Sequence, residues 1–237
     1  AQELALLEPW RGKVPDAVFG PMAVPPRTDG DASLRGNLRK AKALLNAAGW
    51  AVRDGKLRNA KGDAFVLEYL DSNESGARVV TPWARNLEKI GVVLEFRPVD
   101  FALYQQRLQK FNFDITSIAY PGTNNPGQEY ADLFGSKAAD IEDSGNLAGV
   151  KSAAIDAVVA RMVGASSKAD LLPACRALDR VVSYEHLLIP QWTASTHRMA
   201  YNAWRLARPA ATAQYPQGMP PYAQGETWAI ETWWARK

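Results

Sequence analysis

Apolar residues alternate between helical spacing and short strand-like runs through the first half of the chain. Between residues 33 and 48 they recur every three or four positions, which predicts a helix that Asp31 or Ser33 can cap and Gly49 can end. Pro82 lies inside a second helical pattern and indicates a kink or a late start. The predicted order is helix 33–48, strand 65–70, helix 74–90, strand 92–99, helix 101–110 and strand 113–120. This alternation predicts an α/β layer with helices packed on a sheet.

Asp100 can cap the helix at 101–110, whose Phe101, Tyr104 and Leu108 are expected to face inward. The rest of the chain has a different pattern. Residues 120–149 are rich in turn-forming residues, and residues 193–237 are rich in Trp, Tyr, Pro and Ala with weak periodicity. Between these segments the pattern predicts a short helix at 130–134, helices at 152–163 and 170–186, and a buried strand at 187–192.

Composition indicates an ordinary globular chain without a membrane span. The 237 residues are 47% hydrophobic and 22% charged, and the formal net charge is +3. The positive charges are interleaved with acids along the sequence, which excludes the dense clustering of a nucleic-acid binder and favours a solvated surface. No run approaches the length of a membrane span, and AQELALLEPW lacks the features of an export signal. We interpret the chain as a fragment or a processed form.

Catalytic and metal-binding signatures are absent from the sequence. The one cysteine, Cys175, lies on an apolar helical pattern and is expected to be a buried small residue. His186 and His197 lack the spacing of zinc ligands, and no nucleophile elbow or phosphate-binding loop occurs. We therefore predict no catalytic residue, no metal site and no cofactor, although two carboxylates that meet only in the folded chain would escape this search.

The most informative segment is FDITSIAYPGTNNPG, in which an apolar strand runs into a loop of Pro, Gly and Asn. Ligands of open α/β sheets bind beyond the carboxyl ends of strands. Glycine lets backbone approach a ligand, and amide side chains both donate and accept hydrogen bonds. A plain turn cluster explains the same composition equally well. The ligand-binding candidates of this loop are Tyr120, Pro121, Gly122, Thr123, Asn124 and Asn125.

Three further residues are candidates for ligand contact, each with a competing structural role. Asn146 can fix the backbone of a loop, which is the favoured alternative. Arg107 can point to solvent rather than to a ligand carboxylate, and solvent is again favoured. Trp192 ends the apolar run LLIPQW and can form a pocket wall or pack in the core, and both roles remain open.

Several strings in the chain resemble the family 5 extracellular solute-binding proteins. They are AKALLNAAGWAVRDGKLRNAKGDAFVLEYL, WARNLEKIGVVLEFRPVDFALYQQRL, FNFDITSIAY, SGNLAGVKSAAIDAVVARM and ACRALDRVVSYEHLLIPQW, which occur in family order. The run NNPGQEYADLFGSKAAD followed by PQW is most similar to the branch that imports oligopeptides and microcin C-type compounds. The resemblance covers the C-terminal half of a family member.

The resemblance implies a lobe of the type II periplasmic binding protein fold, with a mixed sheet flanked by helices. Residues 1–188 would form the second lobe, and residues 189–237 would cross the hinge and return to the first lobe. It implies a monomeric, periplasmic component of an ABC importer that binds peptides or peptide-like solutes between two lobes and passes them to a membrane permease. Two alternatives stay open, a hydrolase with an unrecognised carboxylate pair and an interaction module that binds no small ligand.

The resemblance also implies that the loop at residues 120–125 contacts the ligand. Peptide binders typical of the family carry an aspartate in this loop, which pairs with the free α-amino group of the peptide. The corresponding stretch here, Gly122 to Asn125, contains no acid. Burying an ammonium group without a charged partner is costly. We therefore predict that the ligand has a blocked amino terminus or places its amino group elsewhere.

Overall fold

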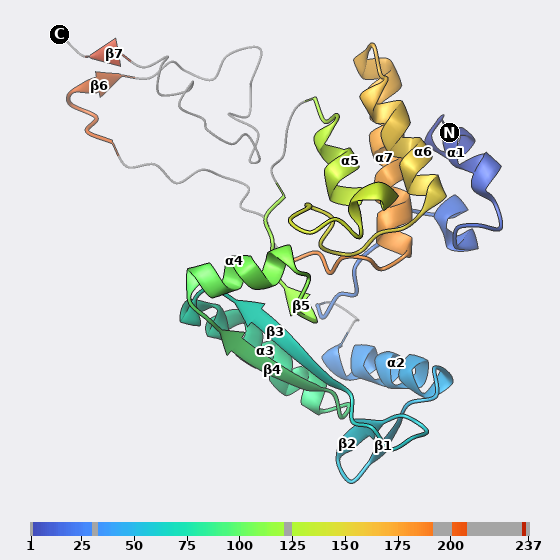
Figure 1. Ribbon diagram of the computed structural model, residues 1–237, viewed down its shortest axis with the longest axis vertical. Coiled ribbons are helices and arrows are strands. Elements are labelled where there is room, and N and C mark those ends of the chain that lie inside the picture. The colour runs from blue at the N-terminus through green and yellow to red at the C-terminus, as the bar shows by residue number, and fades with distance from the viewer. Residues whose placement is uncertain (1, 30–32, 121–124, 192–200, 208–233, 236–237) are drawn as a thin grey trace.

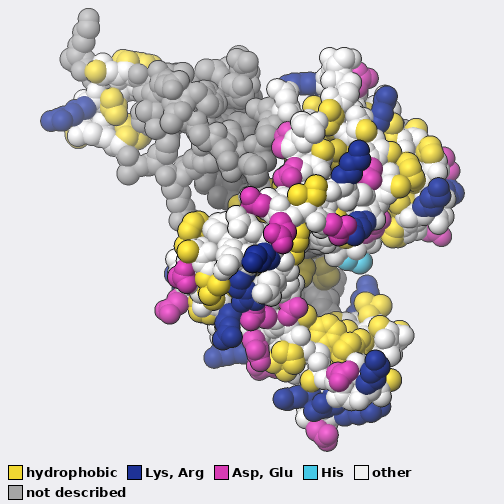
Figure 2. All heavy atoms as spheres, in the orientation of Figure 1, with side chains coloured by type: hydrophobic (Ala, Val, Ile, Leu, Met, Phe, Trp, Pro, Cys, Tyr) yellow, Lys and Arg dark blue, Asp and Glu magenta, His cyan; other side chains and the backbone are white. Residues whose placement is uncertain are grey.

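The computed structural model describes residues 2–29, 33–120, 125–191, 201–207 and 234–235. The last two ranges contain two short strands that pair with each other, and the first three ranges form two packed bodies (Figure 1). One is a helical body with a single large core around Ile155 and Val181. The other is an α/β body whose cores lie on its small parallel sheet and beneath a hairpin. Charged side chains of both signs are interspersed over the face that Figure 2 shows.

The elements follow one another in an order that largely matches the predicted alternation. The helices are α1 (Gln2–Leu7), α2 (Leu34–Ala47), α3 (Ala77–Glu88), α4 (Phe101–Gln109), α5 (Glu129–Phe134), α6 (Ala153–Val163) and α7 (Lys168–Tyr184). The strands are β1 (Ala51–Arg53), β2 (Lys56–Arg58), β3 (Val66–Asp71), β4 (Val93–Pro98), β5 (Ile115–Thr116), β6 (Leu206–Ala207) and β7 (Trp234–Ala235). Short 3-10 helices are η1 (Glu8–Trp10), η2 (Asp16–Phe19), η3 (Glu74–Gly76) and η4 (Ser136–Ala138).

The sheet of the α/β body has the order β4–β3–β5, and both pairings are parallel. Tyr69 of β3 lies opposite Ile115 of β5, so the three carboxyl ends meet at one edge. Helix α3 packs against β4, with Val80 buried against Tyr69 and Leu94. This packing follows from the apolar stripe of α3 and from strands that alternate inward and outward side chains.

A hairpin and helix α2 extend the α/β body at the amino ends of β3 and β4. Ser33 caps α2 by accepting from the Gly36 amide at 3.0 Å, as the sequence predicts. Asp54 and Gly55 both have positive φ and form the two-residue turn between β1 and β2. Leu57 of β2 is fully buried under α2 and fastens the hairpin to the sheet.

The helical body is built from α1, α5, α6 and α7, and α6 and α7 pack along each other. Ser152 and Ser167 cap α6 and α7 with their hydroxyl groups. Arg180 of α7 is 7% exposed and donates through Nη1 to the carbonyl oxygens of Val18 and Gly20, at 3.0 and 2.9 Å. These bonds tie α7 to the segment that leads toward the α/β body.

Three predictions about elements are wrong. Strand β5 covers only Ile115–Thr116 of the expected 113–120. It starts late because the Asp114 carboxylate, rather than strand backbone, accepts from the Glu68 amide at 2.8 Å. Residues 187–191 form no strand, although Leu187 and Leu188 pack on the helical core. Phe101 is 65% exposed, because it lies at the first position of α4 and turns away from the sheet.

Candidate ligand-binding site

Hydroxyl and amide groups gather at the carboxyl end of the sheet. The Thr116 hydroxyl donates to the Leu70 carbonyl oxygen at 3.1 Å and lies 3.2 Å from the hydroxyl of Tyr104. Just beyond β5, the Ser117 hydroxyl contacts the Tyr69 hydroxyl and accepts from Gln191 Nε2 at 3.0 Å. We call this set the hydroxyl cluster: Tyr69, Tyr104, Thr116, Ser117 and Gln191.

The hydroxyl cluster leads from the core to the surface. Tyr69 is 4% exposed, Tyr104 and Thr116 are half-buried, and Ser117 and Gln191 are exposed. The buried end therefore fixes the positions of the two exposed side chains. Ser117 and Gln191 offer a neutral hydroxyl and a neutral amide at the sheet edge where open α/β folds bind ligands.

The loop after β5 begins at Tyr120, which anchors it to the helical body. The Tyr120 ring is half-buried, and its centroid lies 5.6 Å from that of Phe134 in α5. Burial raises the pKa of the Tyr120 phenol, so this group is neutral at physiological pH. Asn125 is exposed where the described chain resumes. The other predicted loop residues lie outside the described residues, and their ligand contacts stay predictions: Pro121, Gly122, Thr123 and Asn124.

Asn146 is fully buried and braces the loop between η4 and α6. Its Nδ2 donates to the carbonyl oxygens of Gly135 and Val150, both at 3.0 Å, and its Oδ1 accepts from the Val150 amide at 2.8 Å. This arrangement is the loop-fixing alternative considered from the sequence. The side chain meets its hydrogen-bonding needs within the protein.

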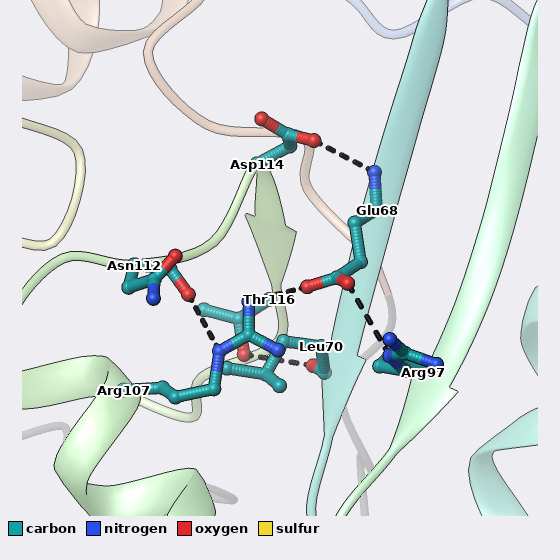
Figure 3. A network of polar contacts seen from close by, with 7 residues as sticks. All are labelled: Glu68, Leu70, Arg97, Arg107, Asn112, Asp114 and Thr116. Atoms are coloured by element: carbon teal, nitrogen blue, oxygen red, sulfur yellow. Dashed lines mark hydrogen bonds and ion pairs between the residues drawn. The ribbon is translucent and has the colours of Figure 1, made fainter.

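Arg107 takes part in an internal ion network beside the sheet (Figure 3). Its side chain is 18% exposed, with Nη2 2.5 Å from Glu68 Oε1 and Nε donating to the Asn112 carbonyl oxygen at 2.9 Å. Arg97 approaches the second oxygen of Glu68 at 3.5 Å. The guanidinium thus joins α4 to β3, and its contacts with Glu68 and Asn112 lie within the protein rather than in open solvent (Figure 3).

The carboxylates next to the hydroxyl cluster each accept a bond within the protein, and one of them, Glu68, is ion-paired. Glu68 is held by two arginines, Asp114 accepts from the Glu68 amide, and Asp71 Oδ1 accepts from the Asn73 amide at 3.0 Å. The exposed part of the cluster is therefore uncharged. Across the described residues there is no group of three or more His, Cys, Asp or Glu side chains that could hold a metal ion.

The sequence predictions located this edge of the sheet but missed most of the side chains that meet there. Two members of the hydroxyl cluster, Thr116 and Ser117, lie in the segment FDITSIAY that the sequence analysis singled out. A third, Gln191, directly precedes the predicted contact residue Trp192. Trp192 itself lies outside the described residues, and its role stays a prediction. No periodicity indicates that residues 74 positions apart, Ser117 and Gln191, form a bond. Tyr69 and Tyr104 show only the apolar spacing of core residues.

A hollow lies away from the hydroxyl cluster, between α5 and α6, with a volume of about 510 Å³. It contains none of the predicted ligand-binding residues. The residues that line it are Gln128, Ala131, Gly135, Lys137, Asp156, Val159, Ala160, Val163 and Gly164.

No described helix of the protein is both long enough and apolar enough to cross a membrane.

Solved structures with the same fold include two peptide-binding proteins. The periplasmic oligopeptide-binding protein of an oligopeptide ABC transporter from Thermotoga maritima superposes with a TM-score of 0.62 at 18% identity, covering 84% of this chain and 39% of that one. The oligopeptide-binding protein AppA from Bacillus subtilis, in complex with a nonapeptide, gives a TM-score of 0.59 at 17% identity, with 100% and 46% covered. These likenesses confirm the predicted type II periplasmic binding fold; the described three-stranded sheet is parallel.

Sequence comparison gives the family. The "Probable peptide-binding protein YejA" of Agrobacterium fabrum is 35% identical over 238 residues, which cover 100% of this chain and 37% of that protein. This chain spans about a third of the length of the curated relatives it matches, less than the half expected from the resemblance. Residues 11–141 match the family model described as "Bacterial extracellular solute-binding proteins, family 5 Middle". The chain therefore belongs to the family 5 bacterial extracellular solute-binding proteins.

Proposed function

We propose that the intact protein is the solute-binding component of an ABC importer and binds peptides or peptide-like solutes. Two lobes close on the ligand about a hinge, and the closed form is presented to the membrane permease. The family and the name of the Agrobacterium relative as a probable peptide-binding protein support this function. The family's extracellular character supports a periplasmic location, and the protein acts as a monomer without catalysing a reaction.

The observation that carries the proposal is the uncharged hydroxyl cluster at the carboxyl end of the sheet. Ser117 and Gln191 are exposed there, and buried neighbours fix Ser117 in place. A peptide backbone presents amide donors and carbonyl acceptors whatever its sequence. Neutral hydroxyl and amide groups can bond to that backbone and leave the ligand side chains free to vary.

In this arrangement residues 1–188 supply the second lobe, and residues 189–237 cross to the first. Gln191 lies at the start of that crossing and bonds to Ser117 of the lobe. The ligand-contact set comprises the hydroxyl cluster's exposed members and the loop at residues 120–125.

The ligand has a blocked amino terminus or places its amino group away from this loop. The loop has no acid, and the neighbouring carboxylates of Glu68, Asp71 and Asp114 already have partners within the protein. The loop itself therefore offers no carboxylate to a free ammonium group, and Glu68 is already paired with Arg97 and Arg107. Calorimetric titration of the intact protein with free and N-formylated forms of one peptide tests this, and tighter binding of the free amine would contradict it.

Alanine substitutions at the two exposed members of the hydroxyl cluster test the function itself. We expect Ser117→Ala and Gln191→Ala each to weaken peptide binding by roughly three- to tenfold, as loss of one neutral hydrogen bond does. Gln105→Ala, which makes the same chemical change on the exposed face of α4, is the matched control. Unchanged affinity in both site variants, or turnover of a peptide or glycoside panel by the wild-type protein, would refute the proposed function.

A further inference from the structure

Helix α2 and the hairpin β1–β2 together carry a concentration of positive charge. Eight Lys and Arg residues but only two Asp residues fall within residues 34–63, while the whole chain has 28 Lys and Arg against 25 Asp and Glu. The rest of the chain therefore has a slight excess of acids. In Figure 2, dark-blue side chains gather at the lower tip, where Figure 1 places β1 and β2.

The strand register places three of these cations on one face of the hairpin. Leu57 is fully buried and therefore sets which face of the hairpin is turned toward the core, although Val52 opposite it is 37% exposed. The neighbouring pairs, Arg53 with Lys56 and Ala51 with Arg58, must then face outward, because side chains alternate along each strand. We call this the basic hairpin face: Arg53, Lys56 and Arg58, with Lys61 in the turn that follows.

The basic hairpin face contains a like-charge pair that folding alone does not favour. Arg53 and Lys56 are directly opposite each other, and like charges in this position destabilise a hairpin. Both side chains are exposed, and neither forms an ion pair with any described residue. Of the two acids, Asp54 is in the turn and Asp63 accepts from Asn59 Nδ2 at 3.0 Å. An anionic partner would relieve this repulsion.

Helix α2 adds to the positive potential of the same part of the molecule. Arg35, Arg39 and Lys42 are spaced so that they share one side of the helix, and all three are exposed. The other side of α2 contacts the core through Leu38, Ala41 and Leu45. No described residue forms an ion pair with this stripe.

The position of the basic hairpin face separates it from the hydroxyl cluster. The Leu57 amide donates to the Gly91 carbonyl oxygen at 2.7 Å, just before β4, and Arg58 bridges to Ala64, just before β3. The hairpin is therefore attached at the amino ends of the parallel strands, whereas the hydroxyl cluster lies at their carboxyl ends. A partner can dock on the hairpin without covering the ligand site.

We propose that the basic hairpin face docks on the anionic lipid headgroups of a membrane surface. Protein partners are usually held by aromatic anchors that enter pockets, and residues 51–63 contain no aromatic residue. The hairpin projects as a tip, and the hollow at α5 and α6 lies on the other body. Arg58 donates to the Gly62 carbonyl oxygen at 2.7 Å, but none of the four cations forms an ion pair with a described residue. Each such cation on a projection adds to the attraction toward a layer of anionic phosphate groups.

Co-sedimentation of the intact protein with lipid vesicles tests this inference. We expect binding to vesicles of phosphatidylglycerol in phosphatidylcholine, little binding to pure phosphatidylcholine, and loss of binding at high salt. Arg53→Gln combined with Lys56→Gln is expected to weaken binding roughly thirtyfold, at about fivefold for each charge removed. Arg161→Gln combined with Arg176→Gln removes the same charge from exposed positions of α6 and α7 and should have little effect.

Stability provides a second, independent measurement. Arg53→Glu replaces the like-charge pair by an opposite-charge pair, so we expect a higher melting temperature together with weaker vesicle binding. Peptide affinity should be unchanged in every hairpin variant. Equal binding to neutral vesicles, equal loss in the α6–α7 control, or salt-sensitive capture by an acidic protein without any binding to anionic vesicles would overturn the lipid proposal.

Discussion

At the scale of single residues, the buried polar side chains of this protein act as braces for irregular backbone. Asn146 holds a loop through three bonds, and Arg180 holds residues 18–20 through two. Each replaces bonds that helices or strands would otherwise supply. A buried carbonyl or amide left without a partner costs more free energy than its bond contributes when made.

The substitution Asn146→Ala tests this bracing role. It leaves the Val150 amide and two carbonyl oxygens without their partner in a fully buried site, so we expect the free energy of unfolding to fall by about 2–4 kcal/mol. Urea denaturation measures the change. Asn46→Ala, on the exposed side of α2, should alter stability by no more than about 0.5 kcal/mol. Equal effects of the two substitutions would contradict the bracing role.

The thiol of Cys175 should react slowly with alkylating reagents in the folded protein. It is half-buried against the helical core, and burial raises the pKa of its thiol, which lowers the fraction of reactive thiolate at neutral pH. We expect iodoacetamide to alkylate Cys175 more slowly in the native protein than in urea at the same pH. Mass spectrometry of the alkylated fraction over time measures both rates. Equal rates would place the thiol in an open, solvated position.

At the scale of elements, the sequence predicts a structural feature best when neighbouring residues alone determine that feature. Ser33 and Asp100 cap α2 and α4 as expected, because capping depends on neighbours within one helical turn. The start of β5 could not be predicted, since it depends on the Asp114 carboxylate meeting Glu68, 46 residues away. The bond between Ser117 and Gln191 was likewise invisible, because it joins segments whose approach only the fold determines.

Gly91 joins two elements at a point where a side chain does not fit. Its φ is +83°, and a Cβ there would lie 2.6 Å from the Leu57 backbone nitrogen. We expect Gly91→Ala to lower the free energy of unfolding by about 2–4 kcal/mol, through backbone strain and a displaced hairpin.

Gly49 provides the matched comparison for Gly91. Its φ is +86°, but a Cβ there would meet nothing within 4 Å. Gly49→Ala should therefore cost only the strain of a left-handed residue, about 1 kcal/mol. Thermal or urea denaturation compares the two variants. A Gly91→Ala variant as stable as Gly49→Ala would show that the hairpin is not held closely to the sheet.

At the scale of the whole molecule, the parallel sheet separates two kinds of surface. Its carboxyl end presents the uncharged hydroxyl cluster, and its amino end carries the basic hairpin face. Helix α3 and the sheet core connect the two. The proposed peptide site and the proposed membrane-docking face therefore lie at opposite ends of the sheet.

Native mass spectrometry of the intact protein, purified from its own host, tests most directly whether the hydroxyl cluster is part of a peptide site. We predict a co-purified mass that fragments as a peptide or a peptide-like compound in the wild-type protein. In the variant that combines Ser117→Ala with Gln191→Ala, the bound fraction should be strongly reduced. A wild-type protein that is consistently free of ligand, or a variant that retains the ligand equally well, would contradict this assignment.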